Sequence, residues 1–331
     1  CSNKSRTREA PTPTNISTKS EPLRLKKGTP ASPATARASN VFPVPGGPKS
    51  NTPLGIFAPN WLNFRGDFKK HEGRNCMKRI VYFILIDLLR NKFVILYTIL
   101  LALLSFSAFS MQDSSSKGIL TLLNIMLLVI PLVSVLFSTT YLFNSSEFIE
   151  LLLSQPVSRK RLWFGIYSGL IISLMLAFLI GAGLPMLYYA DWQLSLIMIF
   201  SGLLVTCIFV SIAFVSAVIS KDKSKGMGVS ILLWLYFSLL FDGILLFIIF
   251  QFSDYPIEKV MALATATSPV DLARIVVLLR MDASAMLGYT GAVFKDLFGD
   301  TNGLYLAMGL LVCWAILPFL ISIKLFQKKD L

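Results

Sequence analysis

Two polar side chains interrupt long apolar stretches of the sequence and are candidates for a function inside a membrane. Asp242 lies within the apolar run 229–252, and Asn124 lies within the run 119–143. A carboxylate in the hydrocarbon core is costly unless it is paired, protonated or facing water. Asp242 therefore either lines a conduit or gate, or bonds a neighbouring helix, or sits at a break at Gly243; no basic intramembrane partner for it is visible. Asn124 is expected to hydrogen bond between helices.

A second group of charges lies between two apolar runs, in residues 144–165. Glu147 and Glu150 flank a short apolar face, Pro156 follows, and Arg159, Lys160 and Arg161 lead into the next run. The pattern predicts a short amphipathic helix that ends at the proline, with Arg159 and Arg161 held at lipid headgroups. Two interpretations are open. The segment docks a cytoplasmic partner, or it is an ordinary positively charged loop that only fixes orientation.

The elements that position these residues are membrane spans. The chain is 54% hydrophobic, and several apolar runs exceed the roughly 18 residues that a helix needs to cross a bilayer. The predicted fold class is an all-α polytopic membrane protein with six transmembrane helices, an N-terminal interfacial helix over 78–92, and a helical extracytoplasmic loop between helices 5 and 6. The predicted spans are 93–111, 119–143, 162–190, 194–220, 229–252 and 303–325. A kink or break is expected near Gly181, Gly183 and Pro185.

Basic residues favour one side of this arrangement. The side that holds both termini carries 13 Lys and Arg, whereas the opposite loops carry five, accompanied by eight Asp and Glu. Because positive residues are retained on the cytoplasmic side, both termini are predicted to be cytoplasmic in a multi-pass protein of the bacterial inner membrane.

The long outer segment 253–302 is predicted to be helical in part. Ser268 is a suitable N-cap, Pro269 suits the first helical position, and Asp271 is an acid in the first turn. Apolar residues then recur at helical spacing, which predicts a helix over 269–280 on the outer surface with one apolar face. A second helix is predicted over 283–298. The segment is either a lid over the bundle or a docking platform for an extracytoplasmic partner, shaped by Pro269, Asp271 and Arg274.

Residues 1–76 have a different character from the rest of the chain. They hold 10 of the 16 prolines and 13 Lys and Arg against 4 Asp and Glu, with no sustained apolar period. The composition predicts a disordered tail. At Met77 the sequence changes abruptly to an apolar one, so we expect the native protein to begin there and residues 1–76 to be an over-extended reading frame. Residues 77–331 form the predicted membrane domain.

Catalytic and metal-binding motifs are missing from the sequence. It contains no GxxxxGK[ST] phosphate loop, one histidine (His71) and no CxxC pair. These absences disfavour nucleotide binding by a phosphate loop, a histidine-based hydrolase and a His/Cys metal site. We expect no catalytic or metal-binding residues and no enzymatic activity in this chain.

The arrangement of these features resembles a known family over residues 77–331. Six spans, the segment Glu147-Phe-Ile-Glu-Leu-Leu-Leu-Ser-Gln-Pro-Val-Ser-Arg159, and the long loop between spans five and six resemble the permease subunits of ABC-2 type transporters. The heptapeptide from Ser268 to Arg274, with Asp242, is similar to the NosY type, the permeases of nitrous-oxide reductase maturation. Ser268 stands where an Asn is expected in that branch.

This resemblance implies a homodimer served by a separate cytoplasmic ATPase that docks on residues 144–161, with Glu147 and Glu150 facing it or capping the coupling helix. ATP and magnesium would be bound by that partner, and no cofactor by this chain. A periplasmic NosD-like protein would sit on the loop 253–302. The system would export or deliver a sulfur species, or copper, for the copper–sulfide centre of nitrous-oxide reductase. The alternatives are an ABC-2 exporter of a lipid, peptide or drug, and a non-transporting scaffold that passes motion across the membrane.

Overall fold

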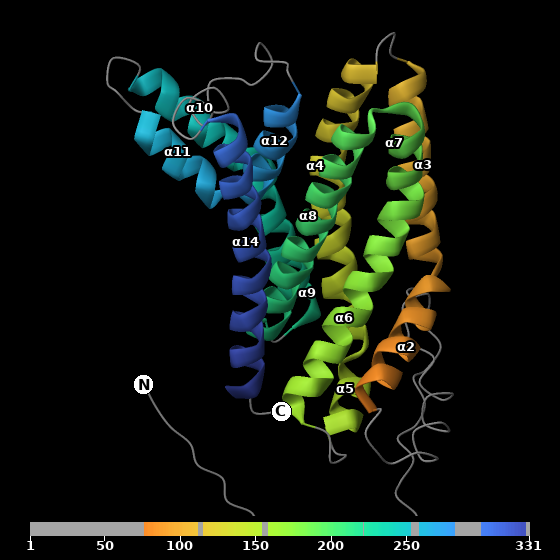
Figure 1. The fold of residues 1–331 in the computed structure, drawn as a ribbon. Coiled ribbons are helices and arrows are strands. Elements are labelled where there is room, and N and C mark those ends of the chain that lie inside the picture. The colour runs from red at the N-terminus through yellow and green to blue at the C-terminus, as the bar shows by residue number, and fades with distance from the viewer. Residues whose placement is uncertain are drawn as a thin grey trace, which may run out of the picture. The chain divides into compact units, whose positions relative to one another are not determined.

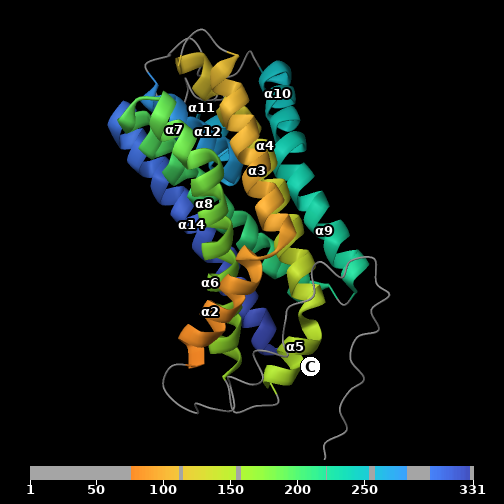
Figure 2. The same ribbon diagram turned by 90° about the vertical axis from the view of Figure 1, so that its right-hand side faces the viewer.

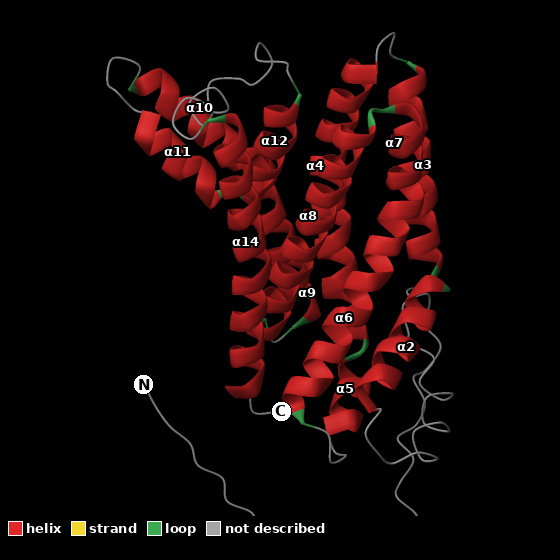
Figure 3. Cartoon of the chain, in the orientation of Figure 1, coloured by secondary structure: helices red, strands yellow, loops and turns green. Residues whose placement is uncertain are grey.

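Long helices make up almost the whole of the described chain. A computed structural model describes residues 76–111, 115–153, 158–220, 222–252, 258–281 and 299–328. Regular structure within these ranges is helical throughout, without a strand (Figure 3). Six segments are long and apolar enough to cross a membrane. The predicted all-α polytopic membrane fold is therefore confirmed, whereas residues 1–75 of the predicted tail and the predicted helix over 283–298 lie outside the described residues.

The six candidate spans begin and end close to the predicted positions, with the largest difference at the start of the fifth. They are Lys92–Ser110 (α3), Lys117–Asn144 within α4 (Ser115–Asn144), Arg159–Tyr189, Trp192–Ile219 (α8), Lys223–Gln251, and Asn302–Lys328 within α14 (Asp300–Lys328). The third span is built from α6 (Arg159–Phe178), η1 (Leu179–Gly183) and α7 (Leu184–Tyr189), and the fifth from α9 (Lys223–Leu235), η2 (Tyr236–Leu240) and α10 (Phe241–Gln251). Helix α2 (Cys76–Leu89) precedes the first span and α5 (Ser146–Leu153) follows the second.

Helix α8 is the centre of the bundle. It packs against α4, α6 and α14. Of the residues in its 18-residue apolar stretch, 67% are buried, compared with 11% in the corresponding stretch of the fifth span. The two ends of the bundle carry different elements (Figures 1 and 2). Helices α2 and α5 and the end of α14 share one end, whereas α7, α10 and α11 (Glu258–Thr267) share the other.

Buried hydroxyl groups form hydrogen bonds between the spans. These bonds are directional, whereas apolar packing is not. The Ser230 hydroxyl lies 2.7 Å from that of Thr139 and 2.6 Å from that of Ser216, which joins α9 to α4 and α8. Trp163 of α6 donates to the Ser322 hydroxyl of α14 at 2.8 Å. Hydroxyl groups within apolar bundles stabilise helix pairs by forming such bonds, on the order of 1 kcal/mol each.

Two spans contain a π-helical turn. The first, η1, falls where the sequence predicts an irregularity, at Gly181 and Gly183. A Cβ on Gly181 would lie 2.7 Å from the Thr98 carbonyl oxygen and 2.8 Å from the Leu101 Cβ, so α3 approaches this turn more closely than any side chain allows. The second, η2, comes directly before Asp242. Single π turns are rare inside α-helices. Where they occur, they are often found at functional sites.

The predicted surface helix over 269–280 exists but is not at the surface. Helix α12 (Pro269–Arg280) has the predicted bounds, and nine of its 12 residues are buried. It packs against α14, α8 and α4, as Figure 1 shows at the upper end of the bundle. With Val260–Thr267 of α11 it forms a pair bent by 111°, apolar enough together to be a broken span or a re-entrant loop. The placement on the outer surface is therefore wrong: the helix is apolar around most of its circumference and is inserted between spans.

Candidate functional site

The polar residues that the sequence analysis assigned to two separate places form one cluster. Asp242 is the second residue of α10, and Arg274 and Asp271 lie one turn apart on α12. The Arg274 guanidinium donates from Nη1 to Asp242 Oδ2 at 3.2 Å and from Nη2 to the same oxygen at 3.3 Å. Its Nη1 also donates to Asp271 Oδ1 at 3.4 Å. Arg274 is therefore the basic partner that the sequence analysis did not find.

Local sequence explains how α12 presents this group. Ser268 caps the helix, because its hydroxyl accepts a hydrogen bond from the Asp271 backbone N–H at 3.3 Å, and Pro269 occupies the first turn. Asp271 and Arg274 are three residues apart, which places both side chains on one helix face. The predicted N-cap and first turn are confirmed. Pro269 and Asp271 are buried, so they shape the helix and the cluster. An exposed surface for a partner would have to come from other residues.

The cluster is asymmetric in burial and in charge. The Asp271 side chain is 7% exposed, whereas those of Arg274 and Asp242 are 33% and 37% exposed. Two carboxyl groups share one guanidinium, so the ionised cluster carries one net negative charge. Asp271 Oδ2 and Arg274 Nε are buried and have no hydrogen-bond partner among the described residues. An incompletely satisfied charged cluster joins a membrane span to the inserted helix and is the candidate site at this end of the bundle.

The amphipathic helix predicted between spans two and three is α5, at the opposite end of the bundle. Phe148, Ile149 and Leu152 are buried, whereas Glu147 and Glu150 are exposed. Arg159, Lys160 and Arg161 form the exposed first turn of α6. Pro156 lies outside the described residues. The geometry leaves both carboxylates of α5 accessible to a partner, with the basic turn next to them along the chain.

Asn124 is exposed on α4. The expectation that it bonds between helices of the same chain finds no support among the described contacts, because its side chain faces outward. Trp234 instead makes the polar link nearby, by donating from its indole to the Leu128 carbonyl oxygen at 3.2 Å.

A further polar link joins α9 to the start of the α5 segment. Lys223 Nζ donates to Asn144 Oδ1 at 2.7 Å, which ties the first residue of α9 to the last residue of α4. Sequence reasoning counted Lys223 only as a positive charge of its loop. The position of Lys223 a few residues before the apolar run 229–252 was the available signal, since a lysine near the end of a span can reach a polar group at the membrane boundary.

Comparison with known proteins was decisive for the family. Residues 84–331 match the model of the ABC-2 family transporter proteins, a region that includes all six candidate spans, α5 and α12. This chain belongs to the ABC-2 transporter family. The ABC-2 assignment agrees with the resemblance noted in the sequence and makes the chain an integral multi-pass membrane protein, the permease subunit of an ABC transporter.

One relative indicates which kind of ABC-2 permease this chain is similar to. The chain is 26% identical over 268 residues to the "Probable ABC transporter permease protein NosY" of Pseudomonas aeruginosa, an alignment that covers 75% of this chain and 96% of the relative. The expected likeness to NosY-type permeases is thereby confirmed. An ABC-2 permease works with a partner ATPase, so the accessible acidic face of α5 and the ion cluster near the other end are the two groups to consider in a mechanism.

Proposed function

We propose that this permease serves maturation of nitrous-oxide reductase by exporting or delivering a sulfur species, or copper, for its copper–sulfide centre. The observation that carries the proposal is the alignment with a NosY permease over 96% of that relative's length. The cluster of Asp242, Arg274 and Asp271 supports it, because those residues are the ones on which the NosY-type resemblance rests.

In this proposal the ATPase binds α5 on the cytoplasmic side of the bacterial inner membrane, where both termini also lie. Glu147 and Glu150 are the exposed charges of α5 and would meet basic residues of the ATPase. ATP and magnesium are bound by that partner. Arg159 and Arg161 hold the following turn at lipid headgroups.

A second copy of the chain completes the transporter in this proposal. The fifth span is the least buried of the six candidate spans, because only 11% of its 18-residue apolar stretch is buried. Its exposed side chains are mostly large and apolar. A periplasmic NosD-like partner would contact the segment between spans five and six through exposed residues of α11, such as Val260 and Leu263, rather than through the buried Pro269 or Asp271.

Deleting the gene in its host and then purifying nitrous-oxide reductase tests the proposal. The expected result is a reductase that lacks its copper–sulfide centre and its activity, with both restored by residues 77–331 of this chain. A fully loaded and active reductase from the deletion strain would contradict the maturation role and leave an ABC-2 exporter of another cargo.

The docking role of α5 is tested separately by charge reversal. Glu147→Lys is expected to abolish co-purification of the ATPase while the permease still inserts, because an exposed acidic contact becomes repulsive. Lys225→Glu is the control, since Lys225 is also exposed, near the start of α9, and lies outside α5. Equal ATPase recovery from both variants would exclude α5 as the docking element.

The ion cluster favours a second possibility, a scaffold that transmits motion without passing cargo. Arg274 fastens α10 to the inserted helix α12, so displacement of the span would move the segment beyond it. Transport of labelled cargo into membrane vesicles distinguishes the two mechanisms, because a scaffold would support reductase maturation in cells without any cargo uptake.

A further inference from the structure

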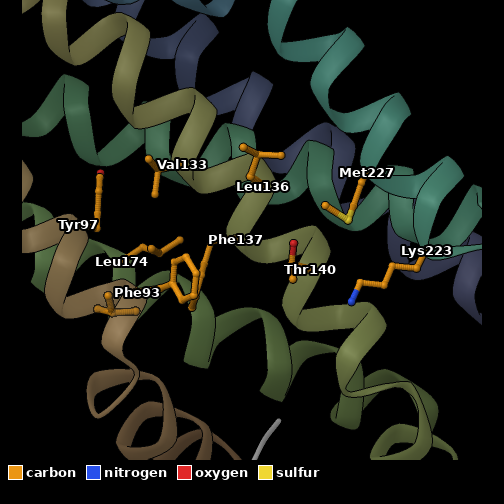
Figure 4. A pocket seen from close by; sticks show the side chains of 10 residues that line it. Phe93, Tyr97, Val133, Leu136, Phe137, Thr140, Leu174, Lys223 and Met227 are labelled. Atoms are coloured by element: carbon orange, nitrogen blue, oxygen red, sulfur yellow. The ribbon is translucent and has the colours of Figure 1, made fainter. Parts of the chain in front are cut away.

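An apolar pocket of about 380 Å³ lies at the α5 end of the bundle, between α3, α4, α6 and α9. Ligand-binding pockets in proteins typically measure about 300–1,000 Å³. Ten side chains line it, among them Phe93, Val133, Leu136, Phe137, Lys223 and Met227, which Figure 4 labels. All ten belong to candidate membrane spans, so the pocket lies at the depth of the bilayer.

The lining predicts a hydrocarbon occupant. Carbon atoms dominate the wall, and an apolar cavity of this kind excludes water and accepts apolar molecules. Phe93 is 37% exposed, so the pocket opens at the surface of the bundle, where lipid chains are the surrounding solvent. An acyl chain is the hydrocarbon present at this depth in every bilayer.

The polar groups of the pocket predict which lipid is held. Lys223 Nζ makes one hydrogen bond, to Asn144, among the described contacts, and an ammonium group has three donors. Arg90 and Lys92 are exposed and lie within three residues of Phe93 in the chain, and Asp222 is paired with Lys225 at 3.2 Å. Lys223 therefore keeps donors for an anionic headgroup, with further basic residues close to Phe93 in the chain.

We infer that this pocket holds an acyl chain of an anionic phospholipid from the leaflet at the α5 end, with the lipid phosphate bound by Lys223. The inference needs neither the proposed cargo nor the proposed ATPase. A bound lipid would affect coupling between the ATPase and the spans only if α5 is the element on which the ATPase docks. In that case a bound lipid would sit beneath the junction of α4 and α5 and stabilise Lys223 in its contact with Asn144.

Photocrosslinking of the full chain in nanodiscs tests the inference. The probe is phosphatidylglycerol with a diazirine on one acyl chain, diluted in unlabelled lipid, and labelled residues are mapped by mass spectrometry. Crosslinks are expected at Leu136, Phe137 or Met227, and unlabelled phosphatidylglycerol should compete better than phosphatidylcholine. Equal competition by both lipids would overturn the assignment of an anionic lipid.

Two variants with matched controls separate the headgroup from the acyl chain. Lys223→Gln should reduce the preference for phosphatidylglycerol about five-fold, which corresponds to ~1 kcal/mol for one lysine near an anionic surface. Lys117→Gln, an exposed lysine near the opposite end of α4 and outside the pocket lining, should leave the preference unchanged. Val133→Phe should remove the pocket label by filling the space, whereas Leu132→Phe, next to it but outside the lining, should not.

Three outcomes would refute the lipid site. One is labelling that persists in Val133→Phe, or in Leu136→Phe where the first variant does not insert. Another is a preference that Lys223→Gln leaves unchanged. The third is efficient disulfide formation between two copies of a Met227→Cys variant without lipid labelling, which would show that a second copy fills the pocket.

Discussion

Replacing Arg274 by glutamine leaves two carboxyl groups, Asp242 and Asp271, without the guanidinium that contacts both. The variant should therefore destabilise the chain, because the attraction is lost and the carboxyl group of the buried Asp271 no longer has a cationic partner. Replacing Asp242 by asparagine is different, because the Arg274–Asp271 pair at 3.4 Å remains and is neutral. We predict that Arg274→Gln lowers the free energy of unfolding more than Asp242→Asn does.

The magnitude follows from the distance and the exposure of the pair. Two unit charges about 4 Å apart attract by about 4 kcal/mol at the effective dielectric of a protein surface. The Arg274–Asp242 distance is 3.2 Å, but these side chains are 33% and 37% exposed, so solvent screens part of the attraction. Exposed pairs contribute about 0–1 kcal/mol and breaking a buried pair costs about 3–5 kcal/mol. Because the exposure is intermediate, the free energy of unfolding should fall by about 2 kcal/mol in Arg274→Gln and by about 1 kcal/mol in Asp242→Asn.

Unfolding of the full chain in mixed detergent and dodecyl sulfate micelles, followed by circular dichroism, measures these differences. Lys225→Gln is the matched control, because its pair with Asp222 is also 3.2 Å long but is 77% and 63% exposed. Its effect should stay below about 0.5 kcal/mol. If Asp242→Asn destabilises more than Arg274→Gln, or if Arg274→Gln equals the control, the charge-balance argument is wrong.

Other predictions concern packing and capping, with the same unfolding assay as the measurement. Gly181→Val should cost about 2–3 kcal/mol, because its Cβ would meet the Thr98 carbonyl oxygen at 2.7 Å, while Gly243→Ala, with no atom within 4 Å, should be nearly neutral. Ser268→Ala should cost about 1 kcal/mol through loss of the α12 cap, and replacement by Asn should restore it. Ser230→Ala should cost about 1–2 kcal/mol, because it breaks both of its hydroxyl bonds; a neutral result would show that the two neighbouring hydroxyls find other partners.

Local patterns in the sequence were sufficient for the bounds of α12 and for its cap, although they did not predict α11. The predicted start of α12 at Pro269, its N-cap at Ser268 and its end at Arg280 all match the structure. These features depend on residues within a few positions of one another, so hydropathy, capping chemistry and proline geometry determine them.

The position of α12 and its ion pair depend on contacts between distant residues. Asp242 and Arg274 are 32 positions apart, and nothing local brings them together. Two signals were nevertheless present in the sequence. Val270, Val277 and Leu278 make α12 apolar beyond a single stripe, which is typical of a buried helix. An acid inside a span is also costly unless it is paired, protonated or facing water, and Arg274 was a basic residue on a helix with a predicted apolar face.

The π turn before Asp242 makes the ion pair depend on helical register. Residues 236–240 accommodate one more residue than an α-helical turn of the same length along the axis. If this turn tightened into an α-helix, every residue beyond it would rotate by about 100° and advance by about 1.5 Å. Asp242 would then point away from Arg274, although both ends of the span would keep their helical hydrogen bonds. A shift of a single residue in η2 is therefore sufficient to engage or release the ion pair of Asp242 with Arg274, which joins α10 to α12.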